Sequence, residues 1–167
     1  MSRYNIVVIL QFILLLFVQA FLLSNINFFG FINPNLYLLF FLMYRFDGDR
    51  TVLIILGFLM GLLLDLLTQG SGGHTIASLT ITYLRPYIIR FSFGVNYDVP
   101  MGMIRGSLVN QRVAYFLQMI LIHHLLLFVV IYFSFDNILT IIKNTFLSAF
   151  FTFTLVYISL GLFKERK

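Results

Sequence analysis

Six runs of mostly apolar residues follow one another along the chain, and short polar stretches separate them. The runs cover residues 5–23, 34–46, 51–67, 74–91, 113–133 and 141–163. Apolar residues are continuous within each run rather than alternating, which favours helices over the strands of a transmembrane barrel. Because about 20 mostly apolar residues suffice for one helical crossing, we predict an all-α polytopic membrane protein with six transmembrane helices. The second and fourth of these helices are expected to be short.

Turn-forming residues occupy the stretches between the apolar runs. Pro34 fits the first turn of the second helix, where its missing N–H leaves no hydrogen bond unmade. Residues 47–50 (DGDR) are expected to form a tight charged turn, and residues 69–73 a glycine-rich loop without charge. The longest connection is residues 91–112. These positions set the boundaries of the six predicted helices.

The composition agrees with a chain that lies almost wholly in the bilayer. Of the 167 residues, 60% are hydrophobic and only 10% are charged, whereas soluble domains carry about 25% charged residues. Six helices of about 20 residues leave roughly 47 for loops and ends, fewer than a folded extramembrane domain needs. We therefore predict one integral membrane domain over residues 1–167. The chain has no cysteine, which excludes disulfides, thiolate chemistry and cysteine-based metal sites.

The distribution of basic residues predicts how the helices are oriented. With the N-terminus in the cytoplasm, ten of the eleven Lys and Arg side chains fall on the cytoplasmic side and only Lys143 falls outside. The ten are Arg3, Arg45, Arg50, Arg85, Arg90, Arg105, Arg112, Lys164, Arg166 and Lys167. Cytoplasmic loops of membrane proteins carry such an excess of basic residues. Six helices with both termini in the cytoplasm are therefore predicted.

Asp65 is the only acidic residue within an apolar run, close to the outer end of the third predicted helix. A carboxylate at membrane depth is a functional candidate, but near a helix end it can instead cap the neighbouring loop or helix. Gly57 and Gly61 precede it at helical spacing and share its face. A Gly-x-x-x-Gly pair lets two helices approach closely. The three residues therefore predict either packing between helices of this chain or contact with a partner helix.

The fifth predicted helix contains three polar candidates, Gln118, His123 and His124. Adjacent helical residues point about 100° apart, so the two histidines cannot hold one metal ion from the same side. Asp65 lies too far from them along the membrane normal for a direct contact. Hydrogen bonds between helices are the expected role, and no metal or cofactor site is predicted.

The basic cytoplasmic loop is expected to include Arg85, Arg90, Arg105 and Arg112. Such a loop can contact anionic lipid headgroups, dock a partner or simply fix the topology. The sequence contains no nucleophile motif, no paired carboxylates in one helix and no phosphate-binding loop. Neither enzymatic activity nor a nucleic-acid partner is expected.

Several segments give the chain a family resemblance. Residues 57–65 (GFLMGLLLD), 70–73 (GSGG), Ala77 and 83–86 (YLRP) resemble the middle of the rod shape-determining proteins of the MreD family. Residues 121–128 (LIHHLLLF) and 133–135 (FSF) resemble the Bacteroidetes-type members of that family.

The resemblance implies a non-enzymatic scaffold of the bacterial cell-elongation machinery. Proteins of this family sit in the inner membrane and act with MreC, and with MreB, RodA and a class B penicillin-binding protein, to organise lateral peptidoglycan synthesis and rod shape. Their fold is similar to that of the substrate-binding components of energy-coupling-factor transporters. Gly57, Gly61 and Asp65 are the residues that carry over.

The alternative function is a small-molecule subunit of a transporter that binds a vitamin-like ligand. It would need a recess on the outer side, for which Asn33, Asn35, Asp65 and His74 are the available polar residues. A binder of polyprenyl lipids is a third option, because an apolar groove leaves no sequence pattern of its own.

Overall fold

The computed structural model describes residues 3–26, 32–44, 50–94 and 107–162. Within these ranges the fold is all-helical, as predicted. Helix α1 (Arg3–Phe17) continues through a π-helical turn, η1 (Val18–Leu22), and a 3-10 turn, η2 (Leu23–Asn25). The remaining elements are α2 (Leu38–Met43), α3 (Arg50–Leu67), α4 (Gly73–Phe93), α5 (Val109–Tyr132), the 3-10 turn η4 (Phe135–Asn137) and α6 (Ile138–Leu162).

Four helical stretches among the described residues are long and apolar enough to cross a membrane. They are Asn5–Asn25, Arg50–Leu67, Val109–Tyr132 and Phe135–Gly161, which correspond to the first, third, fifth and sixth predicted helices. Helix α4 was expected to be short, but its 21 residues reach about 31 Å at 1.5 Å per residue, which is the length of a crossing. It is less apolar on average than these four stretches. The fold is therefore that of a helical multi-pass membrane protein.

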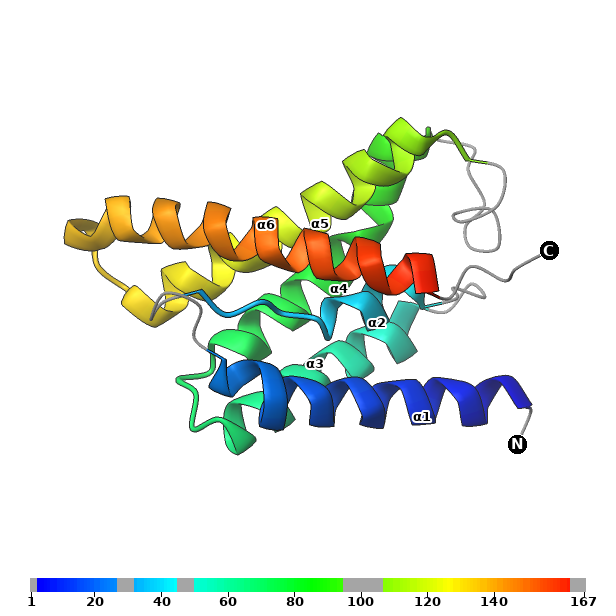
Figure 1. Cartoon of the computed structure of the whole chain (residues 1–167), viewed down its shortest axis with the longest axis horizontal. Coiled ribbons are helices and arrows are strands. Elements are labelled where there is room, and N and C mark those ends of the chain that lie inside the picture. Colours follow the sequence, from blue (N-terminus) through cyan, green and yellow to red (C-terminus); the bar gives the residue numbers. More distant parts are fainter. Residues whose placement is uncertain (1–2, 27–31, 45–49, 95–106, 163–167) are drawn as a thin grey trace.

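The second predicted helix differs most from expectation. A helix over residues 34–46 was predicted, but α2 covers only Leu38–Met43, and the residues before it are extended or turn-forming. Figure 1 shows this segment, in cyan, passing through the middle of the bundle from the end where η2 lies to the end where α3 begins. The four extended residues 32–35 at about 3.3 Å each and the eight turn or helical residues 36–43 at about 1.5 Å each reach roughly 25 Å. The segment thus traverses the bundle with about half the helix that was expected.

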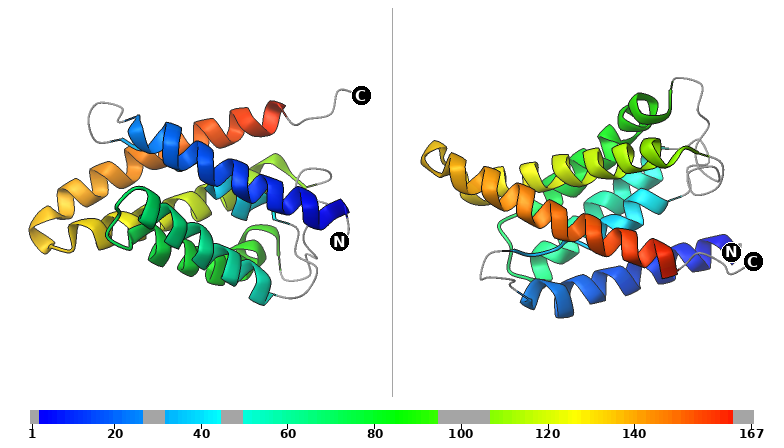
Figure 2. Two further views of the ribbon diagram at one scale, coloured as in Figure 1. Left: turned by 90° about the horizontal axis from the view of Figure 1, so that it is seen from below. Right: turned by 45° about the horizontal axis from the view of Figure 1, so that its top comes forward.

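The helices are arranged so that successive elements run between the same two ends of the molecule. Helices α3 and α4 pack side by side, α4 packs on α5, and α5 packs on α6. Figure 2 shows the same arrangement from two further directions. The start of α1 and the end of α6 lie at one end in every view.

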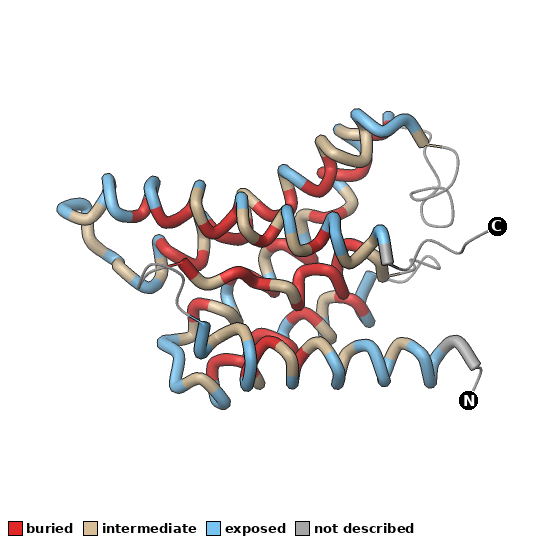
Figure 3. Tube along the Cα trace, viewed as in Figure 1, coloured by how far each residue is buried: buried red, intermediate tan, exposed pale blue. Residues whose placement is uncertain are grey.

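The core surrounds the segment that contains α2. Tyr37, Leu38, Phe41 and Leu42 are completely buried, and Figure 3 shows the buried positions concentrated there and on the inner faces of the neighbouring helices. The outer faces are apolar as well. Along α1, for example, Leu10 and Leu14 are each 61% exposed, which suits a surface in contact with lipid rather than water.

Candidate functional site

A cluster of buried polar side chains surrounds the extended backbone that precedes α2. Gln19 of η1 donates from Nε2 to Pro34 O at 3.2 Å and to Asn35 Oδ1 at 3.4 Å, and its Oε1 accepts the Leu36 N–H at 2.8 Å. The Asn35 N–H donates to Thr152 Oγ1 of α6 at 2.9 Å. Backbone that is not helical is tolerated at membrane depth only where protein groups satisfy it. Gln19 and Thr152 therefore replace the hydrogen bonds that a longer α2 would have made.

His124 of α5 joins this cluster in one defined tautomer. Its Nδ1 lies 2.8 Å from Ile120 O, and a carbonyl oxygen can only accept, so Nδ1 carries the proton. Nε2 then accepts from Asn35 Nδ2 and from the Thr152 hydroxyl, each at 3.2 Å. His124 thus connects α5 to α6 and to the extended segment, and both of its ring nitrogens are engaged.

The hydroxyl of Tyr37 is the centre of a second group of polar contacts. It lies 2.6 Å from His123 Nε2 of α5 and 3.1 Å from His74 Nδ1 of α4, and it accepts from Ser78 Oγ at 3.3 Å. Tyr37, Ser78 and His123 are all completely buried. The hydroxyl therefore connects the start of α2 to both neighbouring helices.

The directions of these hydrogen bonds follow from the number of protons available. A phenol carries one proton, so Tyr37 donates to one histidine and accepts from the other. His123 Nδ1 is buried and has no hydrogen-bond partner among the described residues. An orphaned buried N–H is rarer than an under-satisfied acceptor, so the proton of His123 is assigned to Nε2. His123 accordingly donates to Tyr37, and Tyr37 donates to His74.

Asp65 caps the N-terminus of α4, one of the two roles its position allowed. Its Oδ1 accepts the His74 N–H at 3.2 Å, and its Oδ2 accepts the Thr75 N–H at 2.8 Å and the Thr75 hydroxyl at 2.6 Å. The residue at the N-cap position of α4 is Gly72, which has no side chain. A carboxylate of α3 thus supplies the cap that the local sequence lacks, and its charge suits the positive end of the helix dipole.

Gly57 and Gly61 pack α3 against α4 within this chain. A Cβ atom at Gly57 would lie 2.6 Å from Thr82 Oγ1, and one at Gly61 would lie 2.5 Å from both His74 O and Thr75 Cα. Both glycines are buried. Of the two roles predicted for this pair, the structure shows helix packing, and the lipid-facing partner contact has no free surface at these positions.

Arg85 lies inside α4 and is only 1% exposed, although it was predicted to belong to the basic cytoplasmic loop. Its Nε donates to Tyr115 Oη at 2.9 Å, and its Nη2 donates to Tyr44 O at 2.7 Å and Leu42 O at 3.5 Å. Carbonyls at a helix C-terminus are preferred partners of a cation. Arg85 therefore holds the end of α2 against α4 and α5.

The other basic candidates take different positions. Arg90 is exposed in the last turn of α4, and Arg112 is half-buried in the first turn of α5. Arg105 lies outside the described residues. Gln118 donates weakly to Ser92 of α4 at 3.4 Å. Arg90 and Arg112 therefore lie on either side of the connection between α4 and α5, each within a helix.

The arrangement is a network of hydrogen bonds among buried side chains and backbone. No group of three or more His, Asp or Glu side chains in the described ranges can hold a metal ion. Two of the polar residues considered for an outward ligand-binding recess, Asn35 and Asp65, are buried and hydrogen-bonded within the protein. What the cluster does chemically is to fix a non-helical segment between α1, α4, α5 and α6.

Sequence reasoning missed the residues that matter most to this network. Gln19, Tyr37 and Thr152 had not been singled out. An available signal was that Gln19 is one of the few polar residues within the first apolar run and that Asn35 follows a proline in another. Polar groups in separate crossings tend to meet each other inside the bundle.

Comparisons of the chain with protein families, with curated proteins and with solved structures found no match.

Proposed function

We propose that this chain is a non-enzymatic, multi-pass protein of the cell inner membrane that binds MreC and helps to organise lateral peptidoglycan synthesis and rod shape. The resemblance of its central segments to the MreD family supports the proposal. MreB, RodA and a class B penicillin-binding protein are the further components of the machinery in which it would act. The role is that of a scaffold that holds partner proteins in the membrane.

The observation that carries the proposal is how the polar and glycine residues of the bundle are used. Gly57, Gly61 and Asp65 fix α3 to α4, and Arg85 fixes the end of α2. The residues on which the family resemblance rests therefore hold the helices of this chain together. A protein built in this way acts through the outer faces of its helices and through its loops, which suits a scaffold.

The proposed topology has six crossings and both termini in the cytoplasm. The segment from Ile32 to Tyr44 would form the second crossing and α4 the fourth. Arg50 is the first residue of α3, Arg90 lies in the last turn of α4 and Arg112 in the first turn of α5. These helix ends lie at the end of the molecule where α1 starts and α6 finishes (Figure 1). Lys143 lies near the start of α6, at the opposite end. The positive-inside rule supports a cytoplasmic location for the first end.

Depletion of the protein in its native host, followed by light microscopy, tests the function. Loss of rod shape is the expected result, and re-expression of the native chain should restore it. Unchanged shape together with a requirement for an added vitamin would overturn the scaffold and support the transporter subunit instead.

The direct partner is tested by co-purification with an MreC-like protein of the same host. Capture is expected for the native chain and for a Gly161→Ala variant, since a Cβ at this position meets no atom within 4 Å. A Gly61→Ala variant that is still folded should also retain the partner, because that site is internal. Absence of capture by the native chain in the intact membrane would refute MreC as the direct contact.

A further inference from the structure

A cavity of about 280 Å³ lies between the first turns of α5 and the last turns of α6. Its walls are mostly apolar, with Val113 and Phe116 from α5 and Leu160 from α6. Two polar side chains reach it, Arg112 and Tyr157. None of these residues belongs to the buried polar cluster around Tyr37, so the cavity is separate from the network that holds α2.

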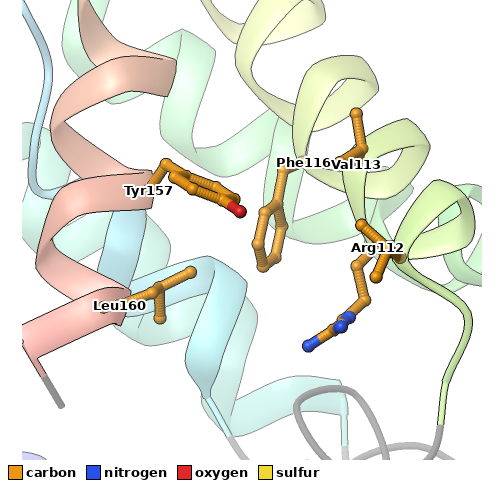
Figure 4. A pocket seen from close by; sticks show the side chains of 7 residues that line it. Arg112, Val113, Phe116, Tyr157 and Leu160 are labelled. Carbon is orange, nitrogen blue, oxygen red and sulfur yellow. The ribbon is translucent and has the colours of Figure 1, made fainter. Parts of the chain in front are cut away.

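Figure 4 shows how the polar groups are placed. The guanidinium of Arg112 extends below the ring of Phe116 toward Leu160, and the hydroxyl of Tyr157 points across the cavity toward Phe116. The side chain of Tyr157 is 59% exposed. The cavity therefore combines a cation, a hydroxyl donor and apolar walls beside an exposed helix face.

This combination matches a ligand that has an anionic head and an apolar tail. Arginine presents five N–H donors in a planar fork that fits phosphate oxygens, so it can bind a phosphate while it also contacts a protein group. The phenol adds one neutral donor. A free inorganic anion would gain nothing from Val113, Phe116 and Leu160, whereas an acyl chain would bury apolar surface against them.

We propose that this cavity binds an anionic phospholipid, with the headgroup phosphate at Arg112 and Tyr157 and an acyl chain along Phe116 and Leu160. The position along the bundle agrees with this occupant. The cavity lies at the end of the molecule that also carries Arg90, in the last turn of α4. A cluster of basic groups at one membrane face attracts anionic headgroups.

Native mass spectrometry of the full-length protein, released from lipid nanodiscs and titrated with defined lipids, tests the proposal. Phosphatidylglycerol should remain bound, and phosphatidylcholine should bind at least about tenfold more weakly. The Arg112→Gln variant should lose about ten- to hundredfold in affinity for phosphatidylglycerol, the range expected for hydrogen bonds to a charged group. Tyr157→Phe should lose a few-fold.

Arg90→Gln is the matched control, because it removes one exposed charge from the same end of the molecule without touching the cavity. Its affinity for phosphatidylglycerol should fall by no more than about fivefold, the contribution of one basic side chain near the membrane surface. Equal losses in Arg112→Gln and Arg90→Gln would overturn the site, since they would indicate attraction by overall charge. If Arg112→Gln does not fold, Arg112→Lys and Tyr157→Phe give the same comparison.

Inorganic phosphate distinguishes a lipid from a free anion. It should not displace bound phosphatidylglycerol at millimolar concentration, because it lacks the apolar contacts. Displacement by phosphate, or equal retention of phosphatidylglycerol and phosphatidylcholine, would overturn the proposal.

Discussion

Replacement of Gly61 by alanine should destabilise the bundle more than any other glycine-to-alanine change along α3 or α6. The added Cβ would lie 2.5 Å from His74 O and Thr75 Cα, whereas ordinary contact begins at 3.4 Å. The difference, 3.4 − 2.5 = 0.9 Å, must be absorbed by moving α3 away from α4, because both atoms are backbone. Overpacking of this kind costs about 1–3 kcal/mol. The shift would also stretch the bonds from Asp65 to Thr75, which lie in the same contact.

Two other glycines give a graded control for this reasoning. At Gly57 the new Cβ would meet Thr82 Oγ1 at 2.6 Å and Thr82 Cγ2 at 2.7 Å, but the nearest backbone atom, Ser78 O, lies at 3.1 Å. Because a side chain is easier to displace than the backbone that Gly61 meets at 2.5 Å, the expected loss is smaller, about 1 kcal/mol. At Gly161 nothing lies within 4 Å, and alanine there should be neutral or stabilising by up to about 1 kcal/mol. Equilibrium unfolding in mixed detergent micelles measures the change in the free energy of unfolding for all three alanine variants. If Gly61→Ala were as stable as Gly161→Ala, the close packing of α3 on α4 would be refuted.

Substitutions at three further positions probe the remaining contacts by the same unfolding assay. Asp65→Ala should lower the free energy of unfolding by about 1–3 kcal/mol, because it removes a charged acceptor from the N-terminus of α4. Asp65→Asn should lower it less, since one oxygen remains. Equal stability of Asp65→Ala and the native chain would exclude the capping role. Thr152→Val should cost about 1–3 kcal/mol, because the buried Asn35 N–H loses its acceptor. Thr152→Ser keeps the hydroxyl and should be close to native; a loss as large as that of valine would assign the effect to the methyl group. Tyr115→Phe should cost about 1–3 kcal/mol by leaving the Arg85 Nε without its acceptor, and a neutral result would show that this bond contributes nothing to stability.

The apolar pattern was sufficient to predict the long helices. Arg50–Leu67, Val109–Tyr132 and Ile138–Leu162 lie within a few residues of the predicted ranges, because continuous apolar runs of this length leave a backbone in lipid no alternative to the helix. From their spacing and depth, Gly57 could pack against a helix of this chain or of a partner, and Asp65 could have a functional role or cap a helix. The choice between the two roles depends on which residues lie next to each side chain in the fold, and sequence spacing does not reveal this.

The segment before α2 could not be predicted in the same way. Its apolar residues suit a helix, and the reason it is not helical lies in Gln19 and Thr152, which are distant in sequence. The prediction that Arg85 belongs to a loop was wrong for a similar reason. A basic residue next to Pro86 was assigned to a loop, whereas Leu42 and Tyr44, more than 40 positions earlier, provide the carbonyls that allow it to be buried in a helix.

The hydrogen bond between Asn35 and Thr152 also constrains the order in which the protein can be assembled. The two residues are 117 positions apart, and α6 is the last described helix to leave the ribosome. Until α6 is inserted, the Asn35 N–H has no partner in the bundle, and an unsatisfied backbone group is costly in hydrocarbon. The extended segment before α2 therefore reaches its final hydrogen bonding only after translation has passed Thr152, so its packing depends on α6 as well as on its own hydrophobicity.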